Sequence, residues 1–193
     1  MKKFCIILLL GALLFSCRKD VMDKTIFIPD KEDANLPAYT EWGYNSFGAE
    51  YDGEYFLSSD AIEPCKIVYN NNLLQFSLSG KIGRYREMTL FFTFPFTQIS
   101  DYKNLVQLNN VKIDLSANDC TVKMLQDGTT TTLNVLEGEL FFKRAQLLRI
   151  DDEVNRVILS GTFNVRFLLN SLPANISNGR FDMGITNNIF YKY

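Results

Sequence analysis

Apolar and polar residues alternate along most of the chain from about residue 45 to the C-terminus. In the stretch 88–96 every even position is apolar, and the odd positions include Thr89, Thr93 and Pro95. A period of two is typical of strands that bury one face, so the even positions are expected to face a core. The same alternation recurs at the odd positions of 157–167 and in the shorter stretches 74–78, 111–115, 120–124 and 181–185.

Turn residues separate these stretches. The Asp-Gly pairs at 52–53 and 127–128 are two-residue hairpin signals, because aspartate and glycine tolerate the positive φ that such turns require. The polar runs 70–72 and 151–153 are expected to form longer hairpin loops. Hairpins join neighbouring strands, so the sheet should be antiparallel.

We expect one domain over 41–193, with a single short helix near 100–105 that Ser100 caps. An antiparallel sheet of this many strands must curl toward closure or split into two packed layers. The expected fold is therefore all-β, an antiparallel β-sandwich or flattened barrel of about nine to ten strands with at most one short helix.

The N-terminal 16 residues have the anatomy of an export signal. Lys2 and Lys3 precede an uncharged run, 4–15, which is too short to cross a bilayer and ends at Ser16. The four residues that end at Cys17 resemble a bacterial lipobox, in which the cysteine is lipidated and becomes the first residue of the mature protein. The alternative is ordinary secretion with an incidental cysteine. Lipidation would hold the protein on a membrane.

Residues 17–40 are expected to form the lipidated N-terminus and a flexible tether. They carry many charges and two prolines, and they show no sustained apolar period. The alternative for part of this segment is that 25–28 docks on the domain as a short strand.

Composition narrows the function. Hydrophobic residues make up 47% of the chain and charged residues 22%, which excludes a disordered protein. The chain has no histidine, which excludes Ser-His-Asp and Cys-His catalysis and histidine-ligated metals. Without Lys2 and Lys3 the mature chain has a net charge of −4 and no basic cluster, so nucleic acid and anionic lipid surfaces are not expected partners.

Carboxylates are the remaining catalytic groups. They gather at 50–54 and at 151–153, where a glycosidase-like acid pair or a calcium site is conceivable. Adjacent acids in hairpin turns are usually solvated, and neither cluster has an ordered ligand spacing. We therefore expect no enzyme activity, no cofactor and no metal site.

Two cysteines remain beyond the signal and the lipid site. Cys65 and Cys120 are an even pair in an exported domain, which allows a disulfide. Both are also candidates for buried free thiols, because cysteine is among the most buried residue types.

The aromatic residues Trp42 and Tyr44 are the candidate binding surface. Phe47 and Ala49 share the parity of the core face. A strand that extended back to residue 42 would therefore turn Trp42 and Tyr44 outward, where they could stack on a sugar or anchor a protein. The alternative is an irregular chain at residue 42, with Trp42 folded over the end of the sheet as a lid on the core.

Several short segments resemble those of small Bacteroidetes cell-envelope lipoproteins that are assigned to domains of unknown function. They are the lipobox at Cys17 and the segments 45–49, 52–53, 160–163 and 178–182. The resemblance implies a Gram-negative cell envelope, with the outer membrane as the location, and it implies no activity.

These observations favour an envelope-anchored, non-catalytic binding or adaptor module whose partner is a glycan or an envelope protein. The alternative is a calycin-like carrier, with a small apolar ligand in a barrel cavity lined by the many phenylalanines of the domain.

Overall fold

The computed structural model describes residues 24–193, so the export signal and Cys17 lie outside the described residues. No helix in the described range is long and apolar enough to span a bilayer. The elements are twelve strands and one 3₁₀ helix: β1 (Ser46–Tyr51), β2 (Glu54–Leu57), β3 (Cys65–Asn70), β4 (Leu73–Ile82), β5 (Arg86–Pro95), η3 (Tyr102–Leu108), β6 (Val111–Asp114), β7 (Thr121–Gln126), β8 (Thr129–Thr132), β9 (Asn134–Ile150), β10 (Glu153–Leu169), β11 (Leu172–Ile185) and β12 (Phe190–Lys192).

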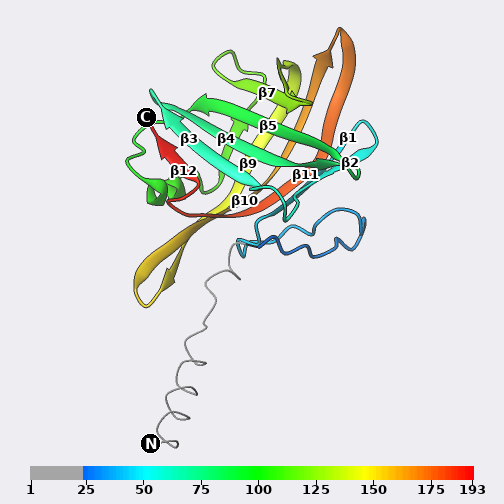
Figure 1. Ribbon diagram of the computed structural model, residues 1–193. Coiled ribbons are helices and arrows are strands. Elements are labelled where there is room, and N and C mark those ends of the chain that lie inside the picture. The colour runs from blue at the N-terminus through cyan, green and yellow to red at the C-terminus, as the bar shows by residue number, and fades with distance from the viewer. Residues whose placement is uncertain (1–23) are drawn as a thin grey trace, which may run out of the picture.

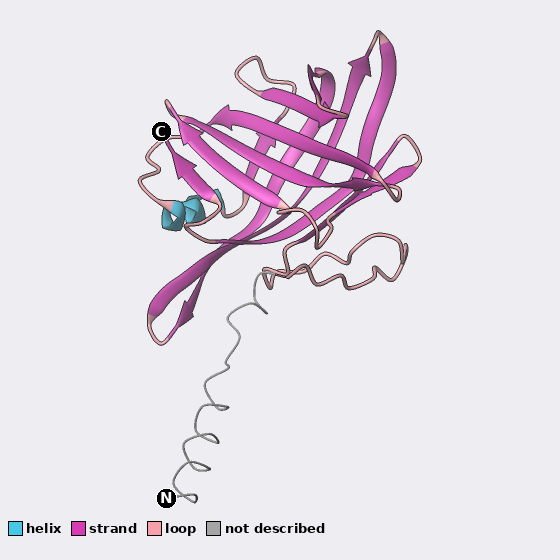
Figure 2. Ribbon diagram, viewed as in Figure 1, coloured by secondary structure: helices cyan, strands magenta, loops and turns pink. Residues whose placement is uncertain are grey.

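All twelve strands belong to one sheet that folds over on itself. The order is β6-β9-β10-β11-β1-β2-β4-β5-β7-β8, with β3 beside β4 and β12 beside β3. The pairs are antiparallel except β12–β3, which is parallel. Figure 1 shows β3, β4 and β5 crossing steeply over β9, β10 and β11, and Figure 2 shows how little of the molecule is helical. The sheet is not closed, so the molecule is a sandwich-like all-β fold.

Phenylalanine rings from the two layers fill the space between them. Phe76 on β4 lies 5.4 Å from Phe142 on β9 and 5.0 Å from Phe181 on β11, measured between ring centroids. Phe92 on β5 lies 5.5 Å from Phe163 on β10. All five rings are buried, and tilted or edge-on contacts of this kind add to the hydrophobic stabilisation. The interior is a packed core.

The alternation predicts the core face correctly. The even positions of β5 from Met88 to Phe94 are buried, and so are the odd positions of β10 from Val157 to Phe167. The structure has twelve strands where about nine or ten were expected. The additional ones are short: β8 is four threonines and β12 has three residues, so neither shows an apolar alternation.

Two hairpin turns are shorter than predicted, and a different residue caps the helix. Asp151 and Asp152 both have positive φ and form a two-residue turn where a longer loop was expected, and Asn71 and Asn72 do the same. The cap of η3 is Asp101, because its side chain accepts a hydrogen bond from the Lys103 amide. The expected cap, Ser100, instead donates to the Asn104 side chain.

Residues 24–40, which were expected to be tether, pack on the domain. The Ile26 amide donates to the Tyr44 carbonyl and the Ala38 amide donates to the Ile28 carbonyl, so that 24–28 runs antiparallel to 38–44. We call these two paired segments the N-terminal ribbon. The ribbon lies at the base of the view in Figure 1, where the chain enters the domain.

The loop between the two segments of the ribbon covers the outer face of β1. Leu36 is fully buried, and a Cβ at Gly48 would lie 2.3 Å from Pro37 Cδ, so only glycine fits there. Arg180 on β11 forms an ion pair with Asp30 at 2.9 Å. The folded domain therefore begins well before residue 41.

Candidate functional site

The candidate site is built on Asp182, an acid in the middle of β11. Its neighbours Phe181 and Met183 face the core, so its side chain points to the opposite side of the sheet. Ser160 of β10 and Ser46 of β1 flank it in the ladder. Asp182 is only 1% exposed because the segment from Thr40 to Tyr44 lies over it.

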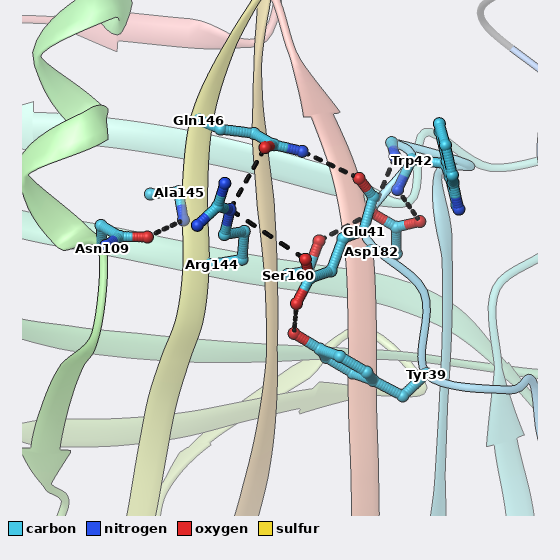
Figure 3. A network of polar contacts seen from close by, with 10 residues as sticks. Tyr39, Glu41, Trp42, Asn109, Arg144, Ala145, Gln146, Ser160 and Asp182 are labelled. Atoms are coloured by element: carbon cyan, nitrogen blue, oxygen red, sulfur yellow. Dashed lines mark hydrogen bonds and ion pairs between the residues drawn. The ribbon is translucent and has the colours of Figure 1, made fainter.

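The carboxylate of Asp182 holds that segment in place (Figure 3). Three of its hydrogen-bond donors are consecutive backbone amides, and two are hydroxyl groups. They are Thr40 Oγ1 at 2.6 Å, Ser160 Oγ at 2.8 Å, and the amides of Gly43 at 2.8 Å, Trp42 at 3.0 Å and Tyr44 at 3.3 Å. We call residues 40–44 the Trp42 loop. An irregular segment thereby acquires one fixed conformation.

Two further contacts close the Trp42 loop against the sheet. Gly43 has a φ of 73°, which favours glycine, and a Cβ there would lie 3.2 Å from Ile158 Cγ1 of β10. The side chain of Asn45, itself at a φ of 54°, accepts a hydrogen bond from the Gly184 amide at 2.9 Å. The loop is therefore tied to both β10 and β11.

Trp42 projects from this loop and is 70% exposed, and in Figure 3 its ring points away from the strands. The outward orientation agrees with the binding-surface hypothesis, but the expected cause differs, since β1 begins only at Ser46. The chain is irregular at residue 42, as the alternative held, yet Trp42 does not cover the core. Tyr44, which was also expected to face outward, is half-buried, and its carbonyl accepts a hydrogen bond from the Ile26 amide.

Polar side chains of the ribbon and β9 surround the base of Trp42. Glu41 accepts a hydrogen bond from the Tyr39 hydroxyl at 2.9 Å, and its carboxylate lies 4.0 Å from Arg144 Nε. Gln146 donates to the Glu41 carbonyl, and Lys143 Nζ lies 4.9 Å from the centre of the Tyr39 ring. Burial, followed by the hydrogen bond to Glu41, raises the pKa of the Tyr39 hydroxyl well above its ordinary value. The acid beside Trp42 is therefore paired.

Apolar side chains of the ribbon extend this surface. Ile26, Phe27 and Ile28 are 43%, 41% and 40% exposed. Ile26 bonds to Tyr44, two residues beyond Trp42, so the apolar segment and the Trp42 loop are neighbours. Successive side chains of an extended segment point to opposite sides, so Ile26 and Ile28 share one side of the ribbon and Phe27 lies on the other, near Leu57 and Lys81. Large apolar residues exposed on both sides of one short segment are unusual.

The structure keeps Cys65 and Cys120 apart as free thiols. Cys65 pairs with Leu78, which pairs with Leu90, which pairs with Met124. Three strand spacings amount to roughly 14 Å, about twice the largest Cα separation that a disulfide bridges. Cys120 lies four residues before Met124, beyond the end of β7. The possible disulfide thus lacks the geometry that it needs.

Both free thiols should react more slowly than an exposed cysteine with a reagent that attacks the thiolate. Complete burial raises the pKa of Cys65 well above its usual value, and burial followed by the nearby Asp119 raises the pKa of Cys120 to about 11. At pH 8 we expect Cys65 to stay unmodified in the native protein. Cys120 should react on the order of 100-fold more slowly than an exposed thiol. Labelling with a chromogenic disulfide reagent measures both rates, and denaturant should release two thiols from this pair. A mass two units lower without reductant would contradict it.

The two acidic clusters lie at hairpin turns. Glu54 forms an ion pair with Arg86 across the hairpin tips, and Asp151 and Asp152 occupy the turn itself, where the Asp152 carbonyl accepts a hydrogen bond from Arg149. Within residues 24–193, no three cysteine or acidic side chains gather where they could hold a metal ion.

No protein-family model, curated protein or solved structure matches this chain. The resemblance to Bacteroidetes envelope lipoproteins therefore stays a prediction.

Sequence reasoning missed Asp182 and Ser160 as the groups that position Trp42. Both lie in segments that stand out in the sequence, 160–163 and 178–182. A lone acid between core-facing residues of a strand was an available signal, but its partners lie far away along the chain.

Proposed function

We propose that this protein is a lipid-anchored, non-catalytic binding module of the cell envelope, and that the Trp42 loop is its contact surface. The sequence supports the anchor through the apolar run and Cys17. A glycan and an envelope protein are the partner classes that an exposed tryptophan beside paired polar groups would suit.

The observation that carries the proposal is the set of hydrogen bonds that the Asp182 carboxylate accepts. A buried acid accepts five of them from one short loop and its supporting strand, and the only tryptophan of the chain is left exposed. Binding to a loop that is already rigid loses less conformational entropy than ordering a flexible one. Asp182 is fully engaged in this role, which weighs against its use as a catalytic acid or base.

The packing of the interior weighs against a carrier of apolar ligands. A carrier of this class needs a cavity of several hundred Å³. The rings of Phe76, Phe92, Phe142 and Phe181 contact one another across the space between the layers, where such a ligand would have to lie.

Fractionation tests the anchor. Wild-type protein should sediment with membranes and carry a lipid mass on Cys17, whereas Cys17→Ser should be released or remain unprocessed, because stable attachment requires the acyl chains. A Cys17→Ser protein that is processed normally and stays membrane-bound would contradict the proposal.

Immobilised protein tests the contact surface. Wild type should retain an envelope component that Trp42→Ala loses. Tyr85→Ala is the matched control, because Tyr85 is an equally exposed aromatic residue at the tip of the β4–β5 hairpin. Equal retention by all three proteins would exclude the Trp42 loop as the contact surface.

A further inference from the structure

We propose that the exposed side chains of Ile26, Phe27, Ile28 and Trp42 dock on the lipid bilayer that holds the anchor. We call these four residues the apolar face. The inference rests on the proposed lipid anchor, and it assigns lipid, in place of a glycan or an envelope protein, as what Trp42 itself contacts.

The composition and exposure of the apolar face fit a bilayer interface. Trp42 is 70% exposed and the three ribbon residues are each about two-fifths exposed, and the backbone of Ile26 pairs with that of Tyr44, two residues beyond Trp42. Tryptophan is enriched at the level of the lipid headgroups, because its ring is apolar and its indole N–H needs a polar partner. Isoleucine and phenylalanine beside it would add buried apolar area.

The length of chain between the anchor and the domain places this face close to lipid. Seven residue steps separate Cys17 from Lys24, where the described structure begins beside the ribbon. Fully extended, they span at most about 25 Å. A domain of this size has a diameter of roughly 40 Å, judged from its expected radius of gyration. The domain therefore cannot leave the membrane by its own width, and the side on which the chain enters is the side next to the lipid.

The charges around Trp42 do not oppose this contact. Glu41 is paired with both Tyr39 and Arg144, and Asp30 is paired with Arg180. Glu41 of the ribbon and Asp30 of the loop that the ribbon encloses thus have partners inside the protein, which lowers the cost of bringing them close to a lipid surface.

Trp42 is the only tryptophan, so its fluorescence reports on the apolar face alone. Lipidated wild-type protein in phosphatidylethanolamine–phosphatidylcholine vesicles, which carry no net charge, should show blue-shifted emission. Brominated lipid should quench this emission, and aqueous iodide should quench it severalfold less than in soluble Cys17→Ser protein. Equal iodide quenching in the two states would overturn the proposal.

Two variants locate the contact. Phe27→Ser combined with Ile28→Ser retains Trp42 as the reporter and should weaken quenching by brominated lipid. Leu172→Ser should leave it unchanged, because Leu172 is even more exposed than Phe27 or Ile28 but lies at the β10–β11 hairpin, at the opposite end of the molecule from the chain entry (Figure 1). Equal effects of the two changes would contradict the assignment, and circular dichroism checks that each variant folds.

Other occupants give distinct results that would also overturn the proposal. Protection of Trp42 from iodide by soluble glycans without vesicles would indicate a sugar site, and protection that rises with protein concentration would indicate a second copy. Mass spectrometry of the N-terminal peptide shows independently whether Cys17 carries the lipid anchor. A protein without lipid therefore refutes the proposed function, whereas a lipidated protein with an accessible Trp42 refutes only the docking.

Discussion

Asp182→Ala is expected to lower the free energy of unfolding by about 3–5 kcal/mol, because the change leaves several buried or half-buried donors without an acceptor. The donors include the amides of Trp42 and Gly43 and the hydroxyl of Ser160. The Trp42 loop should lose its fixed conformation as well. Urea denaturation followed by far-ultraviolet circular dichroism measures the stability.

Two other acid substitutions provide the comparison. Asp182→Asn retains an acceptor oxygen and should cost less than Asp182→Ala. Asp60→Ala removes an exposed carboxylate and should change stability by less than about 0.5 kcal/mol. If Asp182→Ala were as mild as Asp60→Ala, the carboxylate would not be what holds the Trp42 loop.

Phe76→Ala should lower the free energy of unfolding by a similar amount, about 3–5 kcal/mol, for a different reason. Phe76 is fully buried, and its ring contacts Phe92 in its own layer and Phe142 and Phe181 in the opposite layer. Alanine leaves a cavity at the junction of the two layers, and the surrounding rings can fill it only in part. Equilibrium unfolding in urea gives the loss.

The position along β4 supplies the control. Leu73→Ala changes a partly exposed residue at the start of the same strand and should cost less than about 1 kcal/mol. Phe76→Leu keeps most of the volume and should fall between the two. A small effect of Phe76→Ala would mean that the layers do not depend on this ring, contrary to the packing described.

The strands and their inward faces could be predicted because both depend on a local pattern. Successive side chains of a strand point to opposite faces, so the even positions of 88–96 reveal the core wherever the strand lies. The Asp-Gly turns at 52–53 and 127–128 could be predicted for the same reason, since positive φ is a property of the residues themselves. Short strands such as β8 were not predicted, because four consecutive threonines show no alternation of apolar and polar residues.

Sequence reasoning identified Trp42 as a candidate site residue but did not identify the residues that hold it in place. Strand parity gave an exposed Trp42 as only one of two alternatives, and it required a strand that reached residue 42, whereas β1 begins at Ser46. The ring is exposed because Asp182, 140 positions away, holds the backbone of the loop. Charges and prolines in 24–40 predicted a tether, whereas Leu36 of that segment is fully buried against the outer face of the sheet.

The amino-acid sequence by itself determined an all-β domain, its core face and most of its turns, because period-two alternation and positive-φ residues act over a few neighbours. Only the tertiary structure decided how the sheet folds into two layers, that Cys65 and Cys120 stay apart, and that the N-terminal ribbon covers β1. These features depend on strand order and on contacts between Asp182 and residues far away along the chain. No local pattern encodes which distant residues or strands pair, because each of them could pair equally well with many other segments of the chain.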